Sequence, residues 1–168
     1  MKKILLLSTL FLTPAAFAQS ANVRVNPLGL LIGLFNADID FKVTDTVTVG
    51  PQLSYLNWSL GSTSVKAYGI GARANFYLSG PVFTDGWYAA PAVAMAFASA
   101  KNSTDSASYS AVNVSGLFGY QWVWASGFNI NLGFGASYSA RPSSVDGIDI
   151  SGLSAVTPAI EFTLGKTF

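Results

Sequence analysis

The sequence contains no histidine and no cysteine. Histidine changes its charge near neutral pH, so its absence removes the commonest general base and a frequent metal ligand. The absence of cysteine removes disulfides, thiolate metal sites and thiol nucleophiles. We therefore expect a protein that is not an enzyme and that has no catalytic residues, no metal site and no cofactor.

Charged residues are also scarce, at 10% of the chain, and the formal net charge is only +1. A soluble domain usually carries about 25% charged residues, so this composition fits poorly with a surface that faces water all round. With a net charge so close to zero, the chain has neither the basic surface that binds nucleic acid nor an acidic tail that binds a cationic partner. We therefore expect no nucleic-acid partner.

The N-terminus has the layout of a secretory signal peptide. Two lysines follow the first methionine, a largely apolar stretch covers Ile4–Leu12, and small residues flank the aromatic ring within Ala16–Ala18. The apolar stretch is too short for a transmembrane helix, which needs about 20 residues. We expect a signal peptide at residues 1–18 and a single mature domain at residues 19–168.

Most of the remaining chain alternates between apolar side chains and polar or small ones, which is the pattern of β-strands. The clearest run, Phe128–Ser139, places apolar or aromatic residues at every even position and Asn, Gly or Ser at every odd position. Such runs exceed the typical globular strand of about 5 or 6 residues and suit a strand that crosses a bilayer, which needs about 9 to 11. The expected strands cover residues 35–43, 47–55, 67–78, 87–98, 112–124, 128–139 and 154–168.

These runs require one further strand, because bacterial single-chain barrels have even strand numbers. The stretch left for it is Ala21–Gly33, whose pattern is weak. Either a short first strand turns near Gly33, or Asn26 and Pro27 begin a small helix. We expect the strand and keep the helix as the alternative.

Residue size indicates which face of the strands points inward. A soluble barrel or sandwich would show Lys, Glu, Asp and Arg to solvent, whereas the polar face here is mostly Gly, Ala, Ser, Thr and Asn. Small side chains fit the narrow interior of an eight-stranded barrel, so the bulky residues face outward. The sequence thus predicts an all-β fold: an antiparallel, up-and-down transmembrane β-barrel of eight strands, monomeric, with a filled lumen.

The outward aromatic residues predict two girdles, because amphipathic rings settle at the headgroup level of a bilayer. Short turns in such barrels are periplasmic and longer loops are extracellular. On this topology one set of rings lies near the periplasmic edge and the other near the outer edge. The first set is Phe76, Trp87, Trp122, Trp124, Phe128 and Phe168, and the second is Tyr55, Tyr68, Phe97 and Tyr138.

By the same alternation, charged residues point into the lumen at Asp38, Asp40, Lys42, Arg73 and Glu161. A charge inside a narrow barrel must be paired, because an isolated buried charge is strongly unfavourable. One interpretation is that Arg73 and Glu161, with Asp38 or Asp40, form a polar plug that gates a pore. The other, which we favour, is that these charges only satisfy one another and stabilise the barrel.

Three further cations lie at or beyond the expected extracellular rim. They are Lys66, Lys101 and Arg141. Cations in such a position can bind the phosphates of lipopolysaccharide. Ordinary solvation by water is the simpler interpretation, and it is the one that we favour.

The C-terminal strand carries Ile160, Phe162, Leu164 and Phe168 on one face. With the signal peptide, the strand pattern and the short turns, this run makes the chain resemble the small eight-stranded outer-membrane barrels, the class of OmpX, the OmpA membrane domain and the opacity-type proteins. In that class such residues form the signal that the barrel assembly machinery reads. Lys166 departs from the family pattern, which has an apolar or aromatic residue there.

The resemblance implies a location in the cell outer membrane of a Gram-negative bacterium, after export through the periplasm. It also implies membrane lipid, lipopolysaccharide and the assembly machinery as partners. The function expected on this basis is a non-enzymatic structural or interaction role in the cell envelope. A narrow, porin-like channel for small solutes is the alternative.

Overall fold

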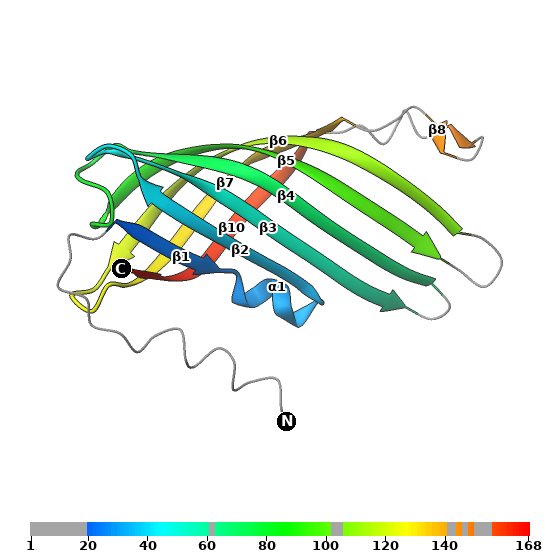
Figure 1. The fold of residues 1–168 in the computed structure, drawn as a ribbon, viewed down its shortest axis with the longest axis horizontal. Helices are drawn as coiled ribbons and strands as arrows, with labels where there is room; N and C mark the ends of the chain where they lie inside the picture. Colours follow the sequence, from blue (N-terminus) through cyan, green and yellow to red (C-terminus); the bar gives the residue numbers. More distant parts are fainter. Residues whose placement is uncertain (1–19, 61–62, 102–105, 141–143, 146–147, 150–155) are drawn as a thin grey trace, which may run out of the picture.

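The computed structural model of the chain describes residues 20–60, 63–101, 106–140, 144–145, 148–149 and 156–168. Residues 1–18, where the signal peptide is expected, lie outside this part. No helix among the described residues is long and apolar enough to cross a membrane. Figure 1 shows long, tilted strands that curve around one interior, with a short helix at the edge of the wall.

Eight antiparallel strands close into one barrel, in which each strand pairs with its neighbours along the chain and the first pairs with the last (Figure 1). The expected all-β, up-and-down fold is therefore confirmed. A separate ribbon of two very short strands, β8 (Ser144–Val145) and β9 (Ile148–Asp149), lies in the last connection. The barrel strands are β1 (Ala21–Val25), β2 (Leu34–Lys42), β3 (Val47–Leu60), β4 (Thr63–Tyr77), β5 (Gly86–Lys101), β6 (Ser106–Val123), β7 (Phe128–Ala140) and β10 (Val156–Thr167).

Both structures considered for the first segment occur, one after the other. The strand β1 ends at Val25, and the helix α1 (Pro27–Leu31) follows it. Asn26 caps the helix, because its side-chain oxygen accepts a hydrogen bond from the Gly29 amide at 3.0 Å. Proline at the first helical position has a suitable fixed φ. The strand is thus shorter than expected, since the Asn-Pro pair stops it.

Gly33 fixes the far end of this helical segment against the barrel. Its φ is 78°, a left-handed value that glycine adopts at little cost. Its carbonyl accepts a hydrogen bond from the amide of Asn57 in β3 at 3.0 Å, and an added Cβ would lie only 2.4 Å from the Asn57 carbonyl oxygen. The close backbone contact explains why a residue with no side chain stands here.

β1 closes only part of the seam between β2 and β10. It pairs with β10 over Leu164–Thr167, whereas β7 pairs with the other edge of β10 from Val156 to Lys166. Among the described residues, no strand pairs with the β1 side of Val156–Thr163. The helix α1 contacts both β2 and β10 there instead.

The barrel is inside out relative to a soluble protein. Bulky apolar and aromatic side chains are exposed on its outer face, among them Tyr68 at 62%, Phe134 at 66% and Ile160 at 83%. The expected orientation, with small and polar residues inward and bulky ones outward, is therefore confirmed. The largest fully buried side chains are almost all polar: Asn22, Arg24, Asp40, Thr48, Asn75, Gln121, Asn129 and Asn131, with Tyr88.

The connection between β4 and β5 folds into one end of the barrel, the end at which the described chain starts at Ser20 and finishes at Phe168. Its Val82 and Phe83 are buried and pack with Tyr77 and Tyr88 in a small apolar cluster, which we call the stopper. The amide of Val82 donates to the Asp45 carbonyl in the β2–β3 turn at 2.7 Å. The stopper therefore covers the lumen at this end.

Candidate functional site: the ion pairs and cavity of the lumen

Arg24 of β1 lies at the centre of a buried network of ion pairs. Its Nε and Nη2 donate to the two Asp40 carboxylate oxygens at 2.7 and 3.1 Å, and its Nη1 donates to Glu161 Oε1 at 2.5 Å. Asp40 belongs to β2 and Glu161 to β10, the two neighbours of β1 in the barrel. The charged, partly bidentate hydrogen bonds therefore join β1 to the strands on both sides.

Arg73 of β4 reaches the same glutamate from the far wall of the lumen. Its Nη2 and Nη1 donate to Glu161 at 2.8 and 3.1 Å, and its Nε donates to Asn75 at 2.7 Å. The Tyr88 hydroxyl donates to Glu161 at 2.9 Å, and the Arg73 guanidinium lies 5.7 Å from the centre of the Tyr88 ring. Glu161 is thus shared by Arg24, Arg73 and Tyr88.

Asp38 is the least satisfied carboxylate of this network. Its Oδ2 is 3.6 Å from Arg24 Nη2 and 4.0 Å from Arg73 Nη1, which is too long for hydrogen bonds. Arg24 and Arg73 bind Asp40 and Glu161 at shorter distances. The network contains two guanidinium groups and three carboxylates, so its formal charge is 2 − 3 = −1.

The structure brings together Asp38, Asp40, Arg73 and Glu161 of the expected lumen charges, but Lys42 does not join them. Lys42 is exposed at the end of β2, and its Nζ lies 2.7 Å from an oxygen of Asp45 in the following turn. Alternation assigns Lys42 to the inner face. At the end of a strand, however, a long side chain can extend its charged group into water.

The Lys42–Asp45 contact lowers the pKa of the Asp45 carboxyl, first through the hydrogen bond from Lys42 and second through charge attraction. We expect Lys42→Met to raise this pKa towards the usual aspartate value of about 3.9. An NMR titration of the Asp45 carboxyl in both proteins measures the change. An unchanged pKa would show that this ion pair does not persist in solution.

Sequence reasoning missed Arg24, the residue with the most charged contacts in the network. A signal was present, because Asn22 and Arg24 alternate with the apolar Ala21, Val23 and Val25. A strand of 5 residues gives few repeats of this pattern, and the helix that follows breaks it.

A layer of buried amides and hydroxyls adjoins the ion pairs, while Tyr88 of the stopper reaches Glu161 directly. Asn75 Nδ2 donates to Thr48 at 2.8 Å, and Asn129 Nδ2 donates to the side chain of Asn22 at 2.9 Å. These side chains come from β1, β3, β4 and β7, so the layer crosses the lumen. Ion pairs, amide layer and stopper together fill the half of the barrel nearer the chain termini.

The other half of the lumen is hollow. It holds a cavity of about 560 Å³, which Asp38, Arg73 and Glu161 line at its inner end. This volume falls within the range of small-molecule sites, about 300 to 1,000 Å³. The expected filled lumen is therefore wrong for this half, where small side chains leave the interior open.

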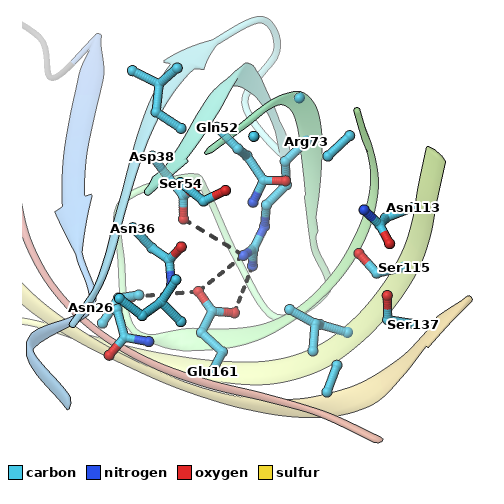
Figure 2. Close-up of a pocket in the computed structure, with 18 of the residues that line it drawn as sticks. Asn26, Asn36, Asp38, Gln52, Ser54, Arg73, Asn113, Ser115, Ser137 and Glu161 are labelled. Carbon is cyan, nitrogen blue, oxygen red and sulfur yellow. Dashed lines mark hydrogen bonds and ion pairs between the residues drawn. The ribbon is translucent and has the colours of Figure 1, made fainter. Parts of the chain in front are cut away.

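Uncharged polar groups line much of this cavity. Figure 2 shows Asn113, Ser115 and Ser137 on one side and Asn36 on the other, with Arg73 and Glu161 meeting between them. The walls therefore offer many hydrogen-bond donors and acceptors, while the charges are confined to the inner end. The uncharged polar residues of the lining include Asn36, Gln52, Ser54, Asn113, Ser115 and Ser137.

Several outward aromatic residues pack against one another on the barrel surface. Near the chain termini, Trp87 stacks on Phe118 with ring centres 5.2 Å apart and meets Tyr120 edge-on. Farther along the barrel, Tyr68 stacks on Phe97 at 5.4 Å. Of the expected girdle residues, Phe97, Phe128 and Phe168 are half-buried, and Tyr55, Tyr68, Phe76, Trp87, Trp122, Trp124 and Tyr138 are exposed.

The expected assembly signal also lies on the outer face. Ile160 is exposed, and Phe162, Leu164 and Phe168 are half-buried. Lys166, the departure from the family pattern, donates a hydrogen bond from Nζ to the Ser126 carbonyl in the β6–β7 turn. A backbone acceptor therefore accommodates this charge at the end of β10.

The hydrogen bonds of Glu161 link β10 to three other strands of the barrel. They reach β1 through Arg24, β4 through Arg73 and β5 through Tyr88. Within the described residues, no group of three or more Asp or Glu side chains is arranged to hold a metal ion.

Comparison with known families places the chain in one of them. A family model described as a protein of unknown function (DUF3575) matches residues 3–144. The chain belongs to the DUF3575 family. No curated protein and no solved structure matches it, so the resemblance to the OmpX class stays a prediction. In this DUF3575 barrel the matched range covers β1 to β7, while Glu161 on β10 lies beyond it.

Proposed function

We propose that this protein is a monomeric, non-enzymatic integral β-barrel of the outer membrane, with a structural or interaction role in the cell envelope. The inverted polarity of the barrel carries the proposal. Bulky apolar residues cover the outer face, while Arg24, Asp40 and other polar residues are buried. Such a surface would associate in water, whereas acyl chains match it in a bilayer.

The barrel ends support the same proposal. The β2–β3, β4–β5 and β6–β7 connections lie at the same end as Ser20 and Phe168, and this end would face the periplasm. In this proposal the expected girdle residues lie at the headgroup regions of the bilayer. The residues of the proposed assembly signal, Ile160, Phe162, Leu164 and Phe168, face outward, where the assembly machinery could read them.

Mobility on gels tests the membrane proposal directly. We expect the detergent-extracted protein to run faster when unheated than when boiled, because a folded barrel resists dodecyl sulfate until it is heated. A protein that remains folded and dispersed in buffer without detergent or lipid would contradict the proposal.

Lipopolysaccharide is the proposed partner at the opposite rim. Lys66 of β4 is exposed there and could meet lipid phosphates. The Lys101 side chain and Arg141, the other two cations expected at this rim, lie outside the described residues.

A narrow channel is the second candidate, and the cavity of about 560 Å³ is the observation that favours it. Three obstacles in series argue against it: the ion pairs, the amide layer and the stopper. We expect no conductance in planar bilayers from the wild type, and none from Arg73→Ala, because two obstacles remain in that variant. Single-channel currents from Arg73→Ala but not from the wild type would instead support a gated pore.

A further inference from the structure

The barrel wall has an open seam beside β10. Among the described residues, Val156–Thr163 pairs with the strand β7 on one side and with no strand on the other, and the helix α1 contacts β10. Unpaired backbone N–H and C=O groups are strongly unfavourable in hydrocarbon. In a bilayer this edge of β10 therefore needs polar contacts from another source.

The cavity of the lumen extends to this seam. Its lining includes Leu34 at the start of β2, Ile160 on β10 and Asn26, the residue that caps α1. Ile160 is also among the most exposed residues of the outer face. The cavity therefore borders the seam on both sides, at Leu34 of β2 and at Ile160 of β10.

The outer border of the seam is apolar. Leu28, Leu30, Leu31 and Ile32 of the helical segment are all exposed, as is Ile160 on β10, a strand that α1 contacts. The inner end of the cavity is polar and charged. A ligand that complements both ends must therefore be amphiphilic, with its polar head inside the barrel and its apolar chain in the seam.

Asp38 determines which head group fits. Its carboxylate lines the cavity, and the guanidiniums of Arg24 and Arg73 are bound more closely by Asp40 and Glu161. The network has a formal charge of −1, so a single cation would bring it to −1 + 1 = 0. A protonated amine supplies that charge together with hydrogen-bond donors for a carboxylate.

We propose that the cavity binds an amphiphile with a protonated amine head, which enters sideways between β10 and α1. The amine pairs with Asp38, and the alkyl or acyl chain leaves through the seam past Ile160. Asn36 and Gln52 offer further acceptors for the head group inside the cavity. The inference rests on the proposed membrane location, because the chain of the ligand ends in the bilayer. Ethanolamine lipids and foreign alkylamines share this chemistry.

Equilibrium binding of radiolabelled dodecylamine to the full chain in maltoside micelles tests the proposal. We expect dodecanoate, which has the opposite charge, and ethylamine, which lacks the chain, to bind at least about tenfold more weakly. Equal binding of the three compounds would overturn the proposal. Competition by lysophosphatidylethanolamine would identify a bilayer lipid as the occupant, and its failure to compete would identify a foreign amine.

Matched variants locate the site. Asp38→Asn should weaken dodecylamine binding about tenfold or more, whereas Asp45→Asn, on the exposed turn at the other end, should not. Ser137→Phe should fill the cavity and abolish binding, while Ala136→Phe places the same ring on the outer face and should leave binding intact. Unchanged binding in both Asp38→Asn and Ser137→Phe would overturn the assignment, and the gel-mobility assay shows that each variant is folded.

The same samples separate the two proposals. A barrel that folds only with detergent or lipid but retains no dodecylamine would contradict the amine site alone. A protein that is folded and dispersed in plain buffer would contradict the membrane location, whatever it binds.

Discussion

Arg24→Met is expected to lower the free energy of unfolding in lipid vesicles by about 3–5 kcal/mol. This is the usual cost of removing one partner of a buried ion pair and leaving the other charge unpaired. The variant loses the three hydrogen bonds by which the Arg24 guanidinium joins β1 to Asp40 and Glu161. The formal charge of the network also changes from −1 to 1 − 3 = −2. Urea unfolding followed by tryptophan fluorescence measures the loss.

Adding Asp40→Asn to Arg24→Met separates charge balance from simple loss of contacts. The double variant returns the network to 1 − 2 = −1, and asparagine keeps the shape of the aspartate. We expect the double variant to be more stable than Arg24→Met alone. If the double variant is only as stable as Arg24→Met, or less stable, unbalanced charge is not the reason why Arg24→Met lowers the free energy of unfolding.

Gly50→Val is expected to prevent formation of the folded barrel. A Cβ at Gly50 of β3 would lie 1.6 Å from the Ile39 carbonyl oxygen of β2 and 2.7 Å from its carbon. Both are backbone atoms in a paired strand, so neither can rotate aside as a side chain could. We expect the variant to lack the fast-migrating form on unheated gels.

Gly116→Val is the matched control for this prediction. Gly116 also lies within a long strand, β6, but a Cβ there would meet nothing within 4 Å. We expect it to fold like the wild type. Equal behaviour of the two variants would mean that the close contact of β2 and β3 at Gly50 does not exist.

Long strands were predictable because their alternation repeats many times. Residues 128–139 were expected as a strand, and β7 covers Phe128–Ala140. The segment from Ala21 to Gly33 was not predictable in the same way. There a strand of 5 residues and a helix of 5 residues share one short stretch, and neither is long enough to impose its period.

The lumen site was predictable in part for a related physical reason. Alternation shows which face a charge lies on, so Asp38, Arg73 and Glu161 could be placed in the lumen. It does not show which charges meet, because that depends on the stagger of distant strands around the closed barrel. Arg24 and Glu161 are separated by 137 positions in the chain. The cavity depends on the same closure and leaves no local mark in the sequence.

Quenching of tryptophan fluorescence by brominated lipids tests the central claim most directly, which is that the bulky outer face contacts acyl chains. Trp87, Trp122 and Trp124 are exposed among the outward residues of the barrel, and Trp58 is exposed near the end of β3. The account predicts that bromine near the headgroups quenches them strongly and that carbonate washing leaves the protein in the vesicles. Unquenched emission from folded protein that washes off the vesicles would contradict it.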